Sequence, residues 1–363
     1  MCIMGPLPKC ERTHFAEDVG TIVSTESSPP RAPNIRDVAR AAGVSYQTVS
    51  RVLNDSPNLR PETRERVQQV IDELGYRPNQ AARALVTSKS NVIGVLVATR
   101  AAAYGVQTIL YAIEDAARAA GYRIAIATSP SDDQSVREAL DQLIGQAAEA
   151  VVVVAPQARV FDLLAATPLK VPFVLLDSAR RDLGHTVAVD QFEGARLATR
   201  HLIELGHTQV IHIAGPQDWI EAEARMQGYL REVSDAELMV RPPVLGDWTA
   251  EFGYRAGREL LNRADFTAVF CSNDLTALGL LHAFRESGIR VPADVSVVGF
   301  DDVPEAAHYW PPLTTIRQDF DEVGRRALAL LLAELGSGDE AVTDLIRPQL
   351  VLRSSTGAPG SGV

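Results

Sequence analysis

The spacing of apolar residues divides the chain into a short helical segment and a longer segment in which strands and helices alternate. From residue 34 to residue 75 apolar side chains recur at helical spacing in three groups, with Gly43 between the first two and Pro61 before the third. The groups are Ile35, Val38 and Ala42; Val49, Val52 and Leu53; and Val67, Val70, Ile71 and Leu74. This pattern predicts a bundle of short helices in which a tight turn joins the first two.

Beyond residue 90, runs rich in β-branched residues alternate with amphipathic stretches. Predicted strands lie at 92–98, 123–128, 150–155, 172–177, 209–215, 267–272 and 295–301, and predicted helices at 106–120, 132–147, 190–205, 220–234, 250–263, 274–287 and 320–335. Continuous apolar strands separated by helices indicate parallel sheets covered on both faces. We therefore expect an α/β body behind an all-α head.

Polar residues end several predicted strands, at the edge where open α/β sheets bind ligands. They are Asp177, Asn273, Asp274, Asp301 and Asp302.

Charge is distributed unevenly along the chain. The formal net charge is −11, but residues 34–90 contain nine Arg or Lys and six Asp or Glu, which gives that window +3 and the remainder −14. A basic segment on an acidic chain fits a DNA-reading head whose body adds little attraction to phosphate.

Composition excludes several classes of protein. Hydrophobic residues make up 46% of the chain and charged residues 22%, as in soluble globular proteins, and no apolar run is long enough to cross a membrane. Residues 1–33 lack a secretion signal, so we expect a cytoplasmic protein with no membrane partner. The three cysteines and the scattered histidines lack metal-ligand spacing, so we expect neither a metal nor a cofactor.

The second predicted helix, in the segment SYQTVSRVL, carries the side chains suited to reading DNA. Ser45 can cap it, and Tyr46, Gln47 and Arg51 share its outward face. Arg pairs with guanine and Gln with adenine in the major groove. Shorter polar side chains suit contacts with phosphate: Thr48, Ser50 and Asn54. A polar face on an ordinary three-helix bundle is the alternative interpretation.

The longer string favours the DNA-reading interpretation. DVARAAGVSYQTVSRVLN, followed by TRERVQQVIDELGYRPNQAARAL, resembles the head of the LacI/GalR family of transcriptional regulators. The resemblance implies a hinge helix after the third helix, matched by Asn79, Ala82 and Leu85, with Leu85 wedged into the minor groove. Two such leucines from two protomers imply a homodimer on a pseudo-palindromic operator. One departure is Arg60, which stands where the family usually has a Ser or Thr cap.

The body resembles the regulatory domain of the same family, two lobes of parallel sheet similar to periplasmic sugar-binding proteins. The matching segments are GDW (246–248), SNDLTALG (272–279), SVVGFDD (296–302) and PPLTTIRQDF (311–320). The resemblance implies that effector-contacting residues are polar at Asp177, Arg225, Asn273, Asp301 and Gln318, and aromatic at Trp248 and Phe320. Carboxylates and amides suit the hydroxyls of a sugar and a ring suits its apolar face, so we expect a sugar effector, with a galactoside favoured.

The resemblance also sets the domain boundaries that we expect. They are a disordered extension or misassigned start at 1–33, a helix-turn-helix DNA-binding domain at 34–78, a hinge helix and linker at 79–90, a two-lobed effector-binding and dimerisation domain at 91–356, and a flexible tail at 357–363. The tail cannot form the leucine-rich helix that a tetramer would need, so a dimer is the expected oligomeric state.

Each site residue has a plainer interpretation. Asp301 and Asn273 could cap helices, Arg225 could form a surface ion pair, and Trp248 could be ordinary packing. At the end of the third strand, Val154 and Ala155 replace an amide that the resemblance leads one to expect, which puts one hydroxyl contact in doubt. Alternatives to an inducible repressor are a regulator that needs a co-repressor and a sugar-binding protein without a regulatory role. No nucleophile elbow or phosphate-binding loop suggests an enzyme.

Overall fold

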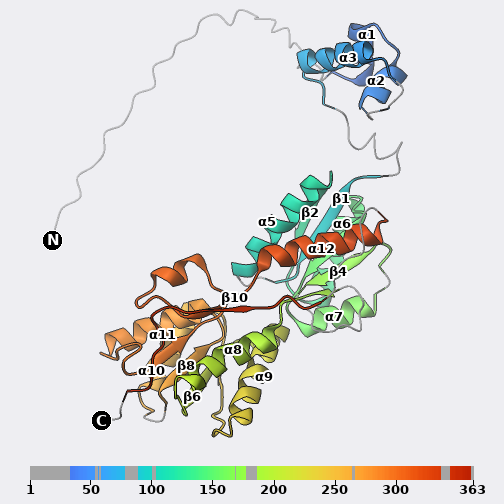
Figure 1. The fold of residues 1–363 in the computed structure, drawn as a ribbon. Coiled ribbons are helices and arrows are strands. Elements are labelled where there is room, and N and C mark those ends of the chain that lie inside the picture. The colour runs from blue at the N-terminus through green and yellow to red at the C-terminus, as the bar shows by residue number, and fades with distance from the viewer. Residues whose placement is uncertain are drawn as a thin grey trace, which may run out of the picture. The chain divides into compact units, whose positions relative to one another are not determined.

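The computed structural model describes residues 33–53, 56, 59–77, 89–99, 104–167, 169–176, 186–263, 266–336 and 344–360. The chain divides into two compact units, residues 1–83 and 84–363, which are described separately below (Figure 1). The predicted hinge residues Asn79, Ala82 and Leu85 lie outside the described residues, as do Asn54 and Asp177. Within the described part of the chain, no helix combines the length and the apolar character that crossing a membrane needs.

The first unit is the predicted three-helix bundle. Its helices are α1 (Ile35–Ala42), α2 (Tyr46–Leu53) and α3 (Pro61–Leu74). Gly43 ends α1 with φ 63°, a left-handed conformation that glycine adopts without strain. Val38, Val49 and Val67, one from each helix, are fully buried together. Arg60 makes no side-chain cap on α3, as its departure from the family pattern predicts.

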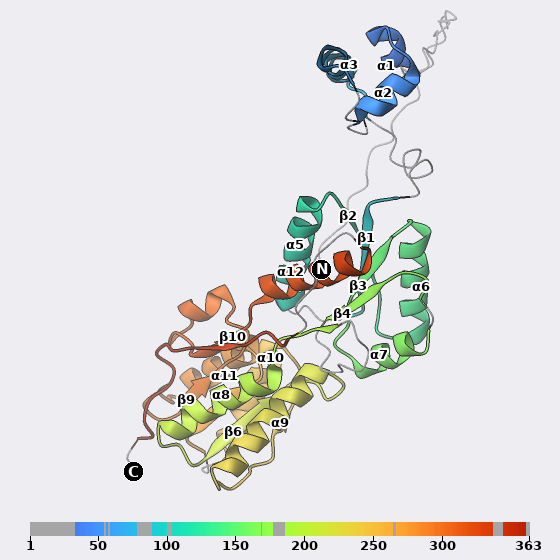
Figure 2. The ribbon, with the colours of Figure 1, turned by 45° about the vertical axis from the view of Figure 1, so that its right-hand side comes forward.

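The second unit has two lobes, and the first is built on a parallel sheet of order β2-β1-β3-β4-β5. The strands are β1 (Val92–Val97), β2 (Arg123–Thr128), β3 (Ala150–Val154), β4 (Phe173–Leu176) and β5 (Thr186–Val187). Helices α5 (Tyr104–Ala119) and α12 (Phe320–Glu334) pack on one face, and α6 (Asp133–Gly145) and α7 (Ala158–Ala165) on the other (Figures 1 and 2). Because helices cover both faces, the central strands β1 and β3 are buried along their length.

The second lobe repeats this plan with a sheet of order β7-β6-β8-β9. The strands are β6 (Val210–Ala214), β7 (Val244–Leu245), β8 (Ala268–Cys271) and β9 (Ser296–Val298). Helices α8 (Gln191–Glu204) and α9 (Ile220–Asp235) pack on one face, and α10 (Ala250–Leu260) and α11 (Asp274–Glu286) on the other. The two-lobed fold of parallel sheets expected from the sequence is confirmed.

The chain passes between the lobes at three places. It enters the second lobe between β5 and α8, returns between β10 (Thr315–Arg317) and α12, and enters again before β11 (Gln349–Val351). Strands β10 and β11 pair antiparallel, and Val189 bridges Ile346, so neighbouring passages support one another. Movement of one lobe against the other must therefore be absorbed at these passages.

Some elements differ from the sequence prediction. Helix α7 and the short strands β5, β7, β10 and β11 were not predicted; strands of two or three residues are too short to show an alternating pattern. At the other end, Gly357 begins the predicted flexible tail. Its N–H donates to Ser296 Oγ (3.0 Å) and its carbonyl oxygen lies 2.9 Å from His207 Nε2, so the tail's first residue is held against the second lobe.

Candidate functional site

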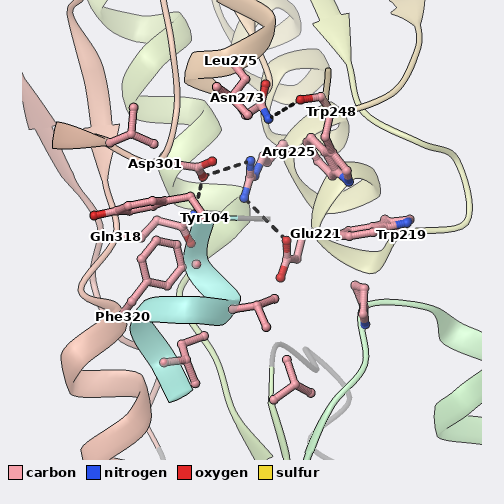
Figure 3. Close-up of a pocket in the computed structure, with 16 residues that line it drawn as sticks. Tyr104, Trp219, Glu221, Arg225, Trp248, Asn273, Leu275, Asp301, Gln318 and Phe320 are labelled. Atoms are coloured by element: carbon pink, nitrogen blue, oxygen red, sulfur yellow. Dashed lines mark hydrogen bonds and ion pairs between the residues drawn. The ribbon is translucent and has the colours of Figure 1, made fainter. Parts of the chain in front are cut away.

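A pocket, partly open to solvent, lies between the two lobes (Figure 3). Tyr104, Val154, Pro156 and Phe320 line it from the first lobe. From the second lobe come the polar and aromatic residues Trp219, Glu221, Arg225, Trp248, Asn273, Asp301 and Gln318.

Arg225 is the centre of the polar wall. It projects from the second turn of α9 and is only 2% exposed. Its Nε donates to Gln191 Oε1 (2.9 Å), its Nη1 donates to the carbonyl oxygen of Ser272, and its guanidinium lies over the ring of Phe300 at 3.9 Å. A buried guanidinium held from several sides is a rigid part of the pocket, so the interpretation of Arg225 as a surface ion pair is wrong.

Asp301 faces Arg225, with 3.6 Å between Oδ1 and Nη1. Its φ is 106°, a conformation that costs energy for a residue with a side chain. The surroundings hold it there: its N–H donates to the carbonyl oxygen of Ile316, and Gln318 Nε2 donates to its Oδ1 (2.7 Å). Burial raises the pKa of Asp301 to about 6, and the nearby Arg225 opposes that rise.

Two glutamines connect this wall to the passages between the lobes. Gln191, at the start of α8, donates through Nε2 to Gln318 Oε1 at 2.6 Å. Gln191 also accepts from Arg225, and Gln318 donates to Asp301. Both glutamines are buried and lie where the chain changes lobe. Hydrogen bonds therefore connect Arg225 and Asp301 to two of the passages.

Asn273 caps a helix, the plainer of the two roles that the sequence left open, and it also lines the pocket. Its Oδ1 caps α11 by accepting from the N–H of Thr276 (2.8 Å), and its Nδ2 donates to the carbonyl oxygen of Trp248 (3.0 Å). The cap fixes the asparagine, and the asparagine fixes the backbone that carries the indole.

Aromatic rings form the apolar part of the pocket. Trp248 packs edge-on against Trp219, with ring centroids 5.2 Å apart, and its Nε1 is buried with no partner among the described residues. On the first lobe Phe320 packs edge-on against Tyr104 at 6.1 Å. The ring of Trp248 lines the pocket, and its Nε1 is a buried donor that ordinary packing leaves unsatisfied.

Of the seven effector residues predicted from the sequence, six line this one pocket, and Asp177 lies outside the described residues. Sequence reasoning missed Tyr104, Trp219, Glu221 and Gln191. Glu221 is one helical turn before Arg225, and this spacing was the signal that could have identified it. Across the described residues, no group of His, Cys, Asp and Glu is arranged to hold a metal ion.

In the helical unit, α2 presents the predicted reading face. Ser45 Oγ accepts from the N–H of Thr48 (3.1 Å), so the predicted cap forms. Tyr46, Gln47 and Arg51 are exposed, and Thr48 and Ser50 are half-buried. Side chains that face outward from a capped helix are free to contact base edges and phosphates.

Comparison with known proteins points to the same kind of protein for both units. Residues 34–79 match bacterial regulatory proteins of the lacI family, and residues 199–356 match a periplasmic binding protein-like domain. HTH-type transcriptional repressors PurR of Haemophilus influenzae (strain PittEE) and Pasteurella multocida (strain Pm70) are 33% and 34% identical, each over 88% of this chain and 98% of the relative.

Solved structures agree with this result. The lac repressor dimer bound to operator and the anti-inducer ONPF is 33% identical, with a TM-score of 0.81 over 90% of this chain and 100% of that chain. The transcriptional regulator CelR in complex with cellobiose is 33% identical, with a TM-score of 0.65 over 89% of this chain and 99% of that chain. The protein therefore belongs to the lacI family and is a DNA-binding transcriptional repressor with an effector-binding body.

Proposed function

We propose that this repressor is a cytoplasmic homodimer that holds a pseudo-palindromic operator and releases it when a sugar occupies the pocket. The observation that carries the proposal is the meeting of Arg225, Asp301 and Asn273 with Trp248 and Phe320 in one pocket. Charged and amide groups bind hydroxyls, and aromatic rings cover the apolar face of a sugar. A galactoside is the preferred ligand.

Operator contact is assigned to α2. Arg51 and Gln47 would read bases, with Tyr46 beside them, while Ser45, Thr48, Ser50 and Asn54 would fix the register on the phosphates. Asn79, Ala82 and Leu85 would form the hinge helix of each protomer on DNA. The lac repressor is a dimer in the operator-bound structure to which this chain is similar, which supports the homodimer.

The link between the two sites is proposed to run through the passages between the lobes. Gln191 and Gln318 join the polar wall of the pocket to two of these passages, near Val189 and Phe320; Pro348 marks the third. A ligand that binds one lobe arrangement better than the other shifts the population by that difference in affinity, and about 1 to 3 kcal/mol is typical of such coupling.

A purine co-repressor is the second candidate. The repressors named PurR are similar over nearly their whole length, and a purine could stack on the same aromatic rings. A sugar is preferred because the similar structures include CelR with cellobiose and the lac repressor with ONPG and with the anti-inducer ONPF. The two candidates predict opposite signs, since a co-repressor strengthens operator binding.

A mobility-shift titration with DNA from the promoter of the gene that encodes this protein tests the proposal. Purified protein is titrated alone, with lactose, galactose or cellobiose, and with hypoxanthine or guanine. Weaker binding with a sugar supports the proposal. Tighter binding with a purine, and no response to sugars, would transfer the assignment to the second candidate.

A further inference from the structure

Glu221 is a pocket residue for which the sugar-binding set above gives no role. It lies in the first turn of α9, and its Oε2 is 3.7 Å from Arg225 Nη2. Its side chain is 16% exposed, and Figure 3 shows it beside Trp219 and below the guanidinium. This long ion pair is the one polar contact of its carboxylate recorded within the described residues, so acceptor capacity remains for a ligand.

The charges that line the pocket do not balance. Glu221 and Asp301 are acidic and Arg225 is the basic partner of both, so the three side chains sum to −1 when both acids are ionised. Arg225 already donates to Gln191 and to Ser272 and pairs with both acids. It is therefore a poor receptor for a further anion.

The position of Glu221 strengthens this conclusion. The N-terminus of a helix attracts anions, and α9 begins at Ile220, next to the pocket. Of the two acidic residues in that first turn, Glu221 is the one that lines the pocket. The backbone holds it there, because the N–H of Ile220 donates to the carbonyl oxygen of Pro156 (3.0 Å) and Trp219 bridges Gln157 on the other lobe.

A phosphorylated or acidic sugar would bring negative charge close to two carboxylates inside a largely apolar pocket. Repulsion is strong where water is excluded, and a phosphate carries roughly −1.5 to −2 charges. A neutral sugar instead donates hydroxyl protons to the same oxygens. We propose that Glu221 is a specificity-determining residue that accepts hydroxyls of a neutral sugar and excludes phosphorylated and carboxylated sugars. This inference rests on the proposed sugar-binding function.

The test compares matched neutral and charged ligands. Binding to the intact protein is measured by calorimetry at pH 7.5 for lactose and lactose 6-phosphate, cellobiose and cellobiose 6-phosphate, and galactose and galactose 6-phosphate. For the sugar that binds, we expect the affinity for the neutral form to exceed the affinity for its phosphate by about 100-fold or more. This ratio corresponds to the repulsion of two charge pairs at close range. The Glu221→Gln variant should reduce this ratio at least about tenfold, since one charge pair is removed.

Glu223→Gln is the matched control. Glu223 is in the same first turn and carries the same charge, but it is exposed and does not line the pocket. The ratio in this variant should equal that of the wild type.

The outcomes separate the two proposals. A phosphorylated sugar that binds the wild type as well as its neutral partner, or an unchanged ratio in Glu221→Gln, overturns the role of Glu221 and leaves sugar binding intact. If no sugar binds and a purine does, the proposed function fails, and this inference fails with it.

Discussion

The indole of Trp248 occupies the space that a side chain at Gly215 would need. A Cβ atom added to Gly215 would lie 2.4 Å from Trp248 Cη2 and less than 3 Å from two further ring atoms. Gly215 follows β6 directly, so the sheet of the second lobe ends where the aromatic wall of the pocket begins.

Gly215→Ala should displace the ring of Trp248 and weaken ligand binding about tenfold or more while leaving operator binding by the unliganded protein unchanged. Such a contact cannot be accommodated without a shift, and an aromatic contact contributes about 1 kcal/mol or more. Calorimetry with the sugar that binds the wild type measures the loss.

Gly145→Ala is the control for this substitution. A Cβ atom at Gly145 meets nothing within 4 Å, and the residue ends α6 in the other lobe. This variant should bind as the wild type does. Equal affinities in the wild type and Gly215→Ala would mean that Trp248 does not contact the ligand.

Arg51→Ala should weaken operator binding about 10- to 100-fold, because a bidentate contact with guanine provides about 1 to 3 kcal/mol of discrimination. The loss should be smaller on nonspecific DNA. Fluorescence anisotropy with operator and scrambled duplexes at one salt concentration measures both affinities.

Arg231→Ala removes the same charge from the body, where Arg231 is exposed near the end of α9. It should leave both affinities unchanged. An equal loss on operator and scrambled DNA in Arg51→Ala would show that Arg51 contacts phosphate and reads no base.

The buried His212 should make the stability of the body depend on pH. It is fully buried, stacks on Phe270 at 4.6 Å, and burial lowers its pKa to about 4 from an ordinary 6.5. Between these values the unfolded chain binds the proton and the folded chain does not. This contribution is therefore complete above pH 6.5 and is lost as the pH falls toward 4, by up to about 3 kcal/mol.

Urea denaturation followed by tryptophan fluorescence at pH 7.5 and pH 5 measures the change, with His212→Phe as the test variant. Its fall in unfolding free energy between the two pH values should be smaller than that of the wild type. His308→Gln, at an exposed position, should fall as the wild type does. An equal fall in unfolding free energy between pH 7.5 and pH 5 in all three proteins would contradict the role assigned to His212.

The helical and strand patterns predicted the two-lobed fold well, because long buried strands such as 150–155 have strong local signals. The expectation that polar residues at the ends of strands line the ligand site was less reliable for single residues. Asp274 follows β8 as expected, but it is buried and accepts from the N–H of Val303 (2.9 Å) and the hydroxyl of Thr315 (2.5 Å). Burial raises the pKa of Asp274 well above its ordinary value.

Asp302, like Asp274, follows a strand without lining the pocket, whereas its neighbour Asp301 lines it. Asp302 pairs with Arg317 at 2.7 Å and with Arg353 at 2.5 Å, so it joins the segments that carry β10 and β11 to the second lobe. Both residues have a positive φ, 106° at Asp301 and 54° at Asp302, but of the two Asp301 lines the pocket. Residue type and position after a strand do not distinguish these outcomes, because long-range partners decide them.

The central claim, that a ligand against Trp248 controls operator binding by α2, is tested most directly with Trp248→Ala. Operator affinity is measured by mobility shift over a full titration of the inducing sugar, with Trp248→Phe as the variant that keeps an aromatic ring. We predict wild-type operator affinity without ligand, no response to the sugar in Trp248→Ala, and a partial response in Trp248→Phe. An unchanged induction curve in Trp248→Ala would contradict the account.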